Sequence, residues 1–425
     1  MERQPLGSGP GVKQQIILIN ALASTAGGGR TWLRNVLPRL ARLSPAETRW
    51  IVLVPPAELE AYRDHGQARV SIETVTTRWG LAGRWWWEQT GLRQMIASRQ
   101  INLLVSVGNF AMWRAPVAQI LFNRSDLNFS AEFRADLWRR RAWGLLLGQL
   151  VKSLLARVSI DEATINVVPT AAFGERIRRA TGRDELHFEV LPFGFDAPLF
   201  RAEQQLTVAE IRQLRGERSG WRLLFVSHYN YFRNFETLLR ALPQLNRLAL
   251  EKTGRSVELI LTTKIARGAR PGGYDATSAA SLIEALGLAP HLRMLGEIPY
   301  PQLHHLYEMC DLFVCPSYSE SFGHPLLEAM ASGLPVATAD LPVHREVGGD
   351  AVATFAPFDP DDLARCCAEL LADEPRRLEM RRRGLARAGV FSWDRHVSGL
   401  VALTERRSDQ RMGTERPEKP EGNYQ

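Results

Sequence analysis

The sequence contains few cysteines and no arrangement of them that is typical of a metal site or a disulfide framework. Four cysteines occur in 425 residues, which is too few for a disulfide scaffold. None has the paired C-x-x-C spacing of a zinc site. An Asp-x-Asp metal motif is missing too, because the adjacent pair Asp361 and Asp362 follows Phe-Asp-Pro at an expected helix start. We therefore expect reduced cysteines, no metal and no cofactor.

Long uninterrupted apolar runs are also missing. The first twelve residues are polar and rich in Gly and Pro, unlike the apolar region of a signal peptide. The longest apolar stretch, residues 142–158, contains Lys152 and Arg157 and is shorter than a membrane-spanning helix requires. We therefore expect neither secretion nor bilayer spanning, and the reduced cysteines favour a cytoplasmic location.

The overall composition is that of a globular protein. Apolar residues make up 45% and charged residues 23% of the chain, which excludes wholesale disorder. The length predicts two or three domains. Only the polar ends, residues 1–12 and 408–425, are expected to be disordered.

Positive charge is concentrated in one part of the chain. Residues 76–160 contain 12 Arg and Lys against four Asp and Glu, an excess larger than the net charge of +7 for the whole chain. Seven tryptophans lie in the same stretch, including the triplet Trp85–Trp87. Cationic residues mixed with tryptophan suggest a surface that meets anions beside apolar matter, such as an anionic membrane. Residues 135–158 read as one amphipathic or largely apolar helix that could make this contact, although a buried helix with solvated arginines fits the pattern equally well.

Short apolar runs alternate with longer helical patterns along the chain. Apolar strands separated by helices indicate parallel sheets covered on both faces, so the pattern predicts two doubly wound, Rossmann-like α/β domains. We place the domains at 13–200 and 201–390, followed by a helix at 391–407 that packs back on the first domain. The expected strands are 15–20, 50–54, 103–107, 118–122, 165–168, 188–191, 222–226, 257–262, 292–295, 312–315 and 336–338.

Ligands of open parallel sheets bind beyond the carboxyl ends of the strands, and two of the loops there carry weak signals. The loop after 15–20 contains Gly27–Gly29 before a helix. Glycines let a phosphate or sugar approach the backbone, although a purely structural turn is about as good an explanation. The loop after 222–226 contains His228 and Arg233, two side chains that could contact a phosphate.

The loop after 312–315 carries the strongest signal. Glu320 lies in the loop beside Phe322 and Gly323, and Pro325 fits the first position of the following helix. We place Glu328 in the first turn of that helix, where the helix dipole alone would favour a carboxylate. Glu320 has no such simple structural explanation.

At these residues the chain resembles the retaining GT-B glycosyltransferases of family 4, the group 1 glycosyltransferases. Glu320 and Glu328 have the E-x7-E spacing of that family, and the segments LLFVSHYNYFRNFETLLRAL and HLRMLGEIPYPQLHHLYEMCDLFVCPS follow its pattern. The likeness covers most of residues 165–400. It implies a GT-B fold in which two Rossmann-like domains face each other across a cleft, with the acceptor on the first domain and a UDP- or GDP-sugar on the second.

The resemblance also implies roles for individual residues. Glu320 and Arg233 would be the catalytic residues, with Glu320 on the donor sugar and Arg233 on the diphosphate, and Glu328 would hold the ribose. His228 stands where the family usually has a cation, which is a departure from its pattern. The remaining implied donor contacts are Gly28 and Gly29, the backbone amides of Phe322, Gly323 and His324, and base-contacting positions at Thr263 and Ile298.

Many family members have a histidine at the end of an N-terminal strand, and this chain has none there. The comparable segment, LFNRSDLNF, offers Asn123, Arg124 or Asp126 for a polar role towards the sugar or acceptor. A plain loop role for Asp126 is the simpler interpretation.

The resemblance therefore predicts a retaining, metal-independent hexosyltransferase acting on a glycan or lipid-linked acceptor, in polysaccharide or O-antigen assembly. If the basic stretch meets lipid, the protein would be peripheral on the inner face of the plasma membrane. A second hypothesis is a catalytically weakened GT-B protein that only binds a nucleotide sugar or glycan. Nucleic-acid binding is not expected, because no motif for it occurs.

Overall fold

The computed structural model describes residues 14–25, 27–66, 68–76, 80–197, 200, 207, 216 and 220–412. The predicted disordered N-terminus and the tail beyond residue 412 lie outside this range, as do Trp79 and most of residues 201–219. The last helix, α17 (Trp393–Met412), continues past residue 408, where the sequence predicted the tail to begin.

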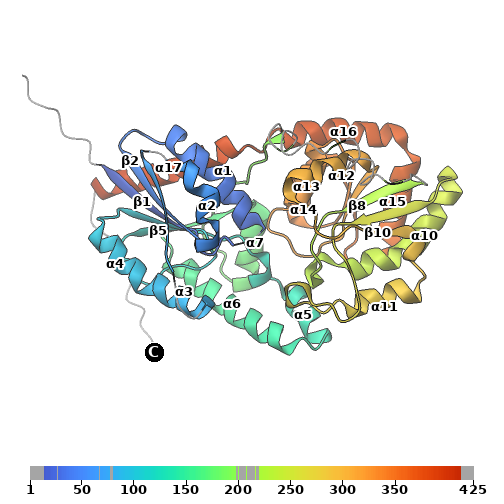
Figure 1. Ribbon diagram of the computed structural model, residues 1–425, viewed down its shortest axis with the longest axis horizontal. Coiled ribbons are helices and arrows are strands. Elements are labelled where there is room, and N and C mark those ends of the chain that lie inside the picture. Colours follow the sequence, from blue (N-terminus) through green and yellow to red (C-terminus); the bar gives the residue numbers. More distant parts are fainter. Residues whose placement is uncertain are drawn as a thin grey trace, which may run out of the picture. The chain divides into compact units, whose positions relative to one another are not determined.

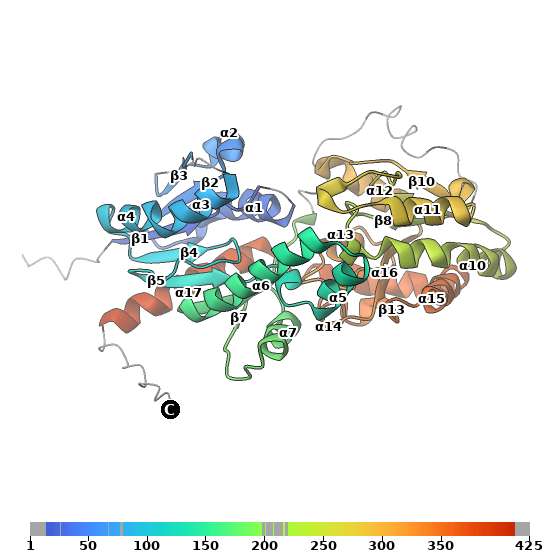
Figure 2. The same cartoon turned by 90° about the horizontal axis from the view of Figure 1, so that it is seen from below.

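The strands form two parallel sheets, as predicted (Figures 1 and 2). The first has seven strands in the order β3-β2-β1-β4-β5-β6-β7, and the second has six in the order β10-β9-β8-β11-β12-β13. The first sheet comprises β1 (Gln15–Asn20), β2 (Thr48–Val54), β3 (Val70–Thr74), β4 (Leu103–Ser106), β5 (Ala118–Phe122), β6 (Ile165–Val168) and β7 (Glu189–Val190). The second comprises β8 (Trp221–Phe225), β9 (Val257–Leu261), β10 (Leu292–Met294), β11 (Leu312–Cys315), β12 (Val336–Ala339) and β13 (Val352–Phe355).

Helices connect the strands. The segment between β1 and β7 contains α1 (Gly28–Leu43), α2 (Leu59–Tyr62), α3 (Gly80–Gln89), α4 (Gly91–Ser98), α5 (Ala131–Arg139), α6 (Trp143–Glu162) and α7 (Ala171–Thr181). The segment after β8 contains α10 (Phe235–Thr253), α11 (Thr277–Ala285), α12 (Leu303–Met309), α13 (His324–Ala331), α14 (Pro342–Gly348), α15 (Pro360–Ala372) and α16 (Glu374–Ala388), followed by α17.

Strand order reverses once in each sheet, and that reversal fixes where a ligand can bind. In the second sheet β8 is flanked by β9 on one side and β11 on the other. The loops that leave the carboxyl ends of β8 and β11 therefore begin on either side of the reversal, the position at which doubly wound folds bind ligands. The loop with Arg233 follows β8 and the loop with Glu320 follows β11, so the topology brings the two predicted catalytic residues to one edge.

The described residues group into two compact units. One contains Met1–Phe122, Ser159–Asn166 and Asp394–Gln425, and the other contains Asn123–Val158 and Val167–Trp393. The predicted limit at 200/201 stays a prediction, because most of the neighbouring residues lie outside the described range.

Within the first unit, α17 packs against α1. The indole Nε1 of Trp32 donates to Nε2 of His396 at 2.8 Å, and both rings pack against Phe122. Arg39 of α1 pairs with Asp394 at 2.7 Å. The C-terminal helix therefore closes the core of the unit that begins with β1.

Two strands and one helix boundary differ from the sequence prediction. β3 was missed because its segment, VSIET, alternates polar and apolar residues at an edge of the sheet. β13 was missed because its four residues include Thr354 and follow no long apolar run. The single helix predicted over 135–158 is two helices, α5 and α6, because Arg141 adopts a left-handed φ of 54° between them.

Candidate functional site at the carboxyl ends of β8 and β11

The loop after β8 is held in place by its own side chains. The side chain of Asn230 accepts a hydrogen bond from the backbone N–H of Arg233 at 3.0 Å, closing a 3₁₀ turn over Tyr231–Arg233. Asn234 then adopts φ 56°, and its amide donates to the carbonyl of Pro316 at 3.2 Å. The loop after β8 is thereby tied to the loop after β11.

These two loops bring Arg233 and Glu320 together. Nη1 of Arg233 contacts Oε1 of Glu320 and donates to Oγ of Ser317 at 3.3 Å. The side chains of both Arg233 and Glu320 are largely buried, with 19% and 10% exposed. Burial lowers the pKa of Arg233, partly offset by Cys315, but an arginine remains a cation at neutral pH. The site thus holds one fixed cation beside one carboxylate.

The turn into α13 follows the prediction in part. Gly323 precedes the helix with φ 90°, a backbone conformation that favours glycine, and Pro325 lies in the first turn. The ring of Phe322 is buried against Phe193 and Phe391, and His324 stacks on Phe193. The side chains of Phe322 and His324 therefore anchor the turn.

The predicted position of Glu328 in the first helical turn is wrong. The helix begins at His324 and its first turn contains no acidic residue, so stabilisation by the helix dipole does not explain this carboxylate. Glu328 is buried and accepts a hydrogen bond from the hydroxyl of Tyr307 at 2.8 Å. Burial raises the pKa of Glu328 to about 7, against the opposing hydrogen bonds from Tyr307 and Tyr300.

The other predicted donor residues lie at different places. His228 is exposed, and only its backbone carbonyl makes a described contact, accepting hydrogen bonds from Ser227 and Asn230. Thr263 and Ile298 follow the adjacent strands β9 and β10. Gly28 and Gly29 begin α1 in the first unit, and a Cβ on Gly29 would lie 2.8 Å from the Cα of Ser24. Close packing alone accounts for a glycine at position 29.

Two of the three N-terminal candidates, Arg124 and Asp126, touch the loop that carries Glu320. The hydroxyl of Ser319 donates to Asp126, and that of Ser321 donates to the carbonyl of Arg124 at 2.7 Å. Asp126 is buried and paired with Nε of Arg176 at 3.0 Å. Burial raises the pKa of Asp126 to about 6, against the opposing effects of Arg176 and Ser319.

Asn123 and Arg124 are inward-facing as well. Asn123 is 2% exposed, and the guanidinium of Arg124 lies 5.2 Å from the ring centroid of Phe193, which stacks on His324. Burial lowers the pKa of Arg124 to about 10, so it remains cationic at neutral pH.

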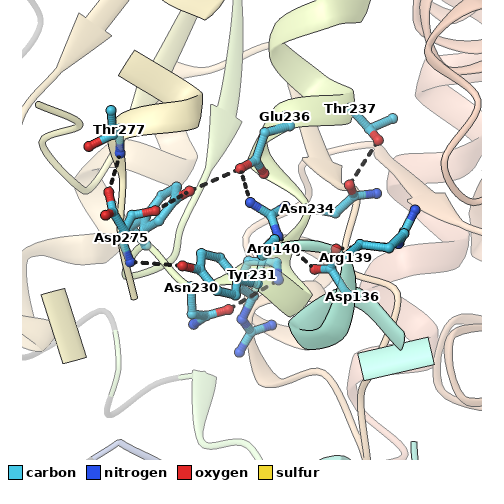
Figure 3. A network of polar contacts seen from close by, with 12 residues as sticks. Asp136, Arg139, Arg140, Asn230, Tyr231, Asn234, Glu236, Thr237, Asp275 and Thr277 are labelled. Carbon is cyan, nitrogen blue, oxygen red and sulfur yellow. Dashed lines mark hydrogen bonds and ion pairs between the residues drawn. The ribbon is translucent and has the colours of Figure 1, made fainter. Parts of the chain in front are cut away.

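A second arginine, Arg140, lies beside the loop that carries Arg233 and holds several polar contacts together (Figure 3). The sequence analysis did not identify it. Nη1 of Arg140 donates to Oε1 of Glu236 at 2.8 Å, and Nε donates to Oδ2 of Asp136 at 3.0 Å. Its guanidinium lies 4.1 Å from the ring centroid of Tyr231, the residue that opens the 3₁₀ turn ending at Arg233. The hydroxyl of Tyr318 donates to Asp136 at 2.9 Å. Arg140 thereby links α5 to both loops of the site.

Two residues next to Glu320 were also missed. One ligand atom from each of Cys315, Glu320 and His344 lies within 4.8 Å of the other two. Burial raises the pKa of the Cys315 thiol, but the neighbouring imidazole of His344, the charge of Arg233 and the hydroxyl of Ser317 outweigh burial and lower it to about 7. No sequence pattern indicates this cluster, because Cys315 has the appearance of an ordinary strand residue.

Helix α6 presents an apolar face to the outside. Leu147 and Leu154 are 66% and 63% exposed, and Trp143, Leu150 and Val151 are exposed on the same helix. The residues that α6 buries instead include Gln149, Ser153 and Ala156. Large apolar side chains therefore lie on the outside of α6 together with Lys152 and Arg157, where a helix on the surface of a soluble domain usually carries mainly polar residues.

The same helix corrects one expectation. With 20 residues, α6 is long and apolar enough to cross a membrane, by length and composition. No other helix in the described part of the chain meets both conditions, and 28% of the apolar segment of α6 is buried. Most of the stretch 142–158, which the sequence analysis judged too short to span a membrane, therefore belongs to a longer helix of 20 residues.

Comparison with known proteins finds a family match in the second half of the chain. Residues 209–387 match the family model of the group 1 glycosyl transferases. This match supports a place in the GT-B glycosyltransferase superfamily. The matched residues include Arg233, Glu320 and Glu328.

Curated relatives of the chain are glycosyltransferases as well. D-inositol 3-phosphate glycosyltransferase of Segniliparus rotundus is 33% identical over 224 residues, which cover 52% of this chain and 47% of the relative. O-antigen chain mannosyltransferase B of Escherichia coli is 35% identical over 156 residues, covering 37% and 39%. The chain thus matches about half or less of the length of these relatives.

Solved structures support the fold over nearly the whole chain. Sucrose-phosphate synthase from Thermosynechococcus elongatus has a TM-score of 0.71 at 17% identity, covering 93% of this chain and all of that one. Anabaena HepE in complex with UDP and glucose has a TM-score of 0.66 at 20% identity, covering 92% and 100%. At these identities the similarity shows the fold, which is GT-B.

Proposed function

We propose that this protein is a retaining, metal-independent hexosyltransferase of family 4 that transfers a sugar from a UDP- or GDP-sugar to a glycan or lipid-linked acceptor. The observation that carries the proposal is the contact between Arg233 and Glu320 at the strand-order reversal of the second sheet. A cation and a carboxylate at that edge are the two groups that a sugar diphosphate requires, one for the phosphate and one for the sugar hydroxyls.

The donor would replace the ion pair with two new contacts. Arg233 would turn from Glu320 to the diphosphate, where negative charge develops as the sugar leaves, and Glu320 would accept hydrogen bonds from the hydroxyls of the sugar. The N-terminus of α13 adds positive potential at the same edge. With a fixed guanidinium and helix amides, the departing charge is stabilised by the chain's own groups.

Glu328 and the loops after β9 and β10 would bind the nucleoside. Glu328 is held by Tyr307 beneath the turn into α13, and we assign it to the ribose. Thr263 and Ile298 lie at neighbouring strand ends and would contact the base. Asn123, Arg124 and Asp126 contact or flank the loop of Glu320, and we assign them to the sugar or acceptor side, with Gly28 and Gly29 as further donor contacts.

The relatives support this class of reaction. One named relative transfers to inositol 3-phosphate and another is an O-antigen chain mannosyltransferase, and HepE was solved with UDP and glucose. We therefore place the reaction in cell-surface polysaccharide or O-antigen assembly. The alternative is a weakened GT-B protein that only binds a nucleotide sugar or glycan. Two features favour it: His228 replaces an expected cation and is exposed, and the histidine that many family members have at the end of an N-terminal strand is missing.

The outward apolar face of α6 supports a peripheral membrane location on the inner face of the plasma membrane. Lys152 and Arg157 are exposed on the same helix, and Arg139 and Arg141 are exposed just before it. Apolar side chains flanked by cations fit an anionic lipid surface. A lipid-linked acceptor would be found at that surface, whereas nucleic acid would leave the apolar side chains uncovered.

A panel of nucleotide sugars tests the proposal. A ligand that binds the native state raises the melting temperature in proportion to the logarithm of its concentration. We expect one UDP- or GDP-sugar to raise the melting temperature of the wild-type chain, and the Arg233→Met variant to lose that increase. Wild-type protein that responds to none of these nucleotides would contradict the proposal.

A further inference from the structure

Cys315, Glu320 and His344 reach one point from three separate elements. Cys315 ends β11, Glu320 lies in the loop that follows, and His344 lies on α14. One ligand atom from each lies within 4.8 Å of the other two. A thiolate, a carboxylate and an imidazole are the three kinds of ligand that zinc takes from proteins.

The hydrogen bonds of His344 leave one ring nitrogen ready to bind a metal. Nδ1 lies 2.8 Å from the carbonyl oxygen of Ala339 and 2.7 Å from Oγ1 of Thr338. A carbonyl oxygen only accepts hydrogen bonds, so Nδ1 carries the proton and Nε2 of the neutral ring has a free lone pair. Metal-binding histidines are held in this way, by a carbonyl on the other ring nitrogen.

The free nitrogen of His344 is buried. His344 is 0% exposed, and its Nε2 has no hydrogen-bond partner. A buried polar atom without a partner is costly, and native proteins seldom keep one. Cys315 and Glu320 lie close to His344, so a single cation could bind all three side chains.

We propose that Cys315, Glu320 and His344 form a binding site for a thiophilic divalent cation, with Zn²⁺ as the matching ion, and that its occupancy switches off the sugar transfer. When the ion binds, the thiol of Cys315 releases its proton to solvent, and bonds form from the metal to Sγ, to Nε2 of His344 and to a carboxylate oxygen of Glu320. The hydroxyl of Ser317, 3.6 Å from Sγ, or a water molecule completes four-fold coordination.

The inhibition rests on the proposed function, whereas the metal site does not. Arg233 and the metal would compete for the same carboxylate, because Glu320 pairs with Arg233 in the absence of metal. A coordinated Glu320 cannot accept hydrogen bonds from the donor sugar in the same geometry. Zn²⁺ would therefore act as a reversible inhibitor of a reaction that itself needs no metal.

Cobalt spectroscopy on the tag-free, reduced, metal-free chain tests the site independently of activity. Co²⁺ replaces Zn²⁺ with the same ligands, and a thiolate ligand gives it a charge-transfer absorption band. We expect one Co²⁺ per chain with such a band, bleached by added Zn²⁺. Cys315→Ser should abolish the band. His344→Gln should weaken Co²⁺ binding by more than about tenfold, because losing even an outer-shell partner of a metal ligand costs about 10–100-fold in affinity.

Cys310→Ser is the matched control, because Cys310 is another cysteine without a disulfide, five residues earlier, and its replacement should leave the band unchanged. Melting curves of each variant establish that it is folded. A wild-type chain without a thiolate band, or a folded Cys315→Ser variant that keeps it, would overturn the metal site.

A transfer assay separates the two claims. We expect Zn²⁺ to inhibit the wild type and the Cys310→Ser variant but not Cys315→Ser. If the cobalt band depends on Cys315 and the protein transfers no sugar from any donor, the metal site stands and the proposed function fails. If transfer occurs and Zn²⁺ inhibits wild type and Cys315→Ser equally, the switch is refuted.

Discussion

The guanidinium of Arg233 contacts the carboxylate of Glu320, although 87 residues separate them in the chain. The pair forms because β8 and β11 are neighbours at the point where strand order reverses. On the proposed function each partner takes the place of the other's ligand, because Arg233 donates to Glu320 where the sugar hydroxyls would, and Glu320 faces Arg233 where the phosphate would. The pair balances one positive and one negative charge at this edge of the sheet.

Replacing Arg233 by lysine should reduce transfer although the charge is retained. A lysine ammonium cannot reproduce the forked geometry of a guanidinium on a diphosphate, and loss of one such contact to developing charge costs about 10²–10³ in kcat. Steady-state kinetics with the donor from the thermal screen measure the effect. Arg240→Lys, an exposed position on α10, is the control and should behave as wild type, so equal rates for the two variants would refute the role of Arg233.

Arg140→Met should destabilise the protein strongly. It leaves Glu236, which is 4% exposed, without its cation, and breaking a buried ion pair costs about 3–5 kcal/mol. Urea unfolding measures the loss, and Arg139→Met is the control, because Arg139 is exposed and its partner Asp136 keeps the ion pair with Arg140. Adding Glu236→Gln to Arg140→Met should recover part of the loss, and a double variant no more stable than Arg140→Met would contradict the pairing.

Stability should fall as the pH rises from about 4.5 to about 7. The pKa of Glu328 is raised from 4.5 to about 7 by burial, so between these values the folded chain binds more protons than the unfolded chain. Ionising the buried carboxyl costs roughly 3 kcal/mol, at about 1.4 kcal/mol per pKa unit. Asp126, with its pKa raised to about 6, adds to the same trend.

Urea unfolding of wild type and Glu328→Gln at pH 5 and pH 8 measures this contribution. Glutamine keeps an oxygen that can accept from Tyr307 and cannot ionise, so the variant should lose less stability between the two pH values than wild type. Identical losses in the two proteins would show that Glu328 does not titrate in this range.

The apolar face of α6 should bind anionic vesicles. We expect the wild type to float with vesicles that contain anionic lipid and to bind neutral vesicles more weakly. Leu147→Glu combined with Leu154→Glu should abolish flotation, since both side chains are exposed and neither replacement buries a charge. Leu250→Glu, at an exposed position on α10, is the control and should float normally. Flotation of the double variant would exclude this surface.

The sequence predicted the sheets and placed Arg233 and Glu320 in loops beyond the carboxyl ends of strands, because both predictions depend on local patterns. Apolar runs mark parallel strands, and ligands bind beyond their carboxyl ends, so Arg233 and Glu320 could be found from the chain alone. The contact between Arg140 and Glu236 could not be predicted, because the two residues are 96 positions apart and no sequence pattern relates them.

Tertiary packing also determines features that the apolar periodicity of the sequence leaves open. An apolar helix pattern shows which residues share a face but not whether that face is covered, and α6 leaves Leu147, Leu150 and Leu154 exposed. The break before α6 depends on the left-handed backbone of Arg141, a conformation that arginine seldom adopts. Cys315 and His344 meet only because β11 and β12 pair in the register that sets Cys315 beside Thr338.

The central claim is tested most directly by a sugar-transfer assay that compares wild type with Glu320→Gln, using the donor identified in the thermal screen. The replacement keeps the shape of the side chain and removes the charge that Arg233 balances. We predict that the folded variant loses transfer by about 10²-fold or more while the wild type forms a product with the anomeric configuration of the donor. A Glu320→Gln variant that transfers sugar at the wild-type rate would contradict the account.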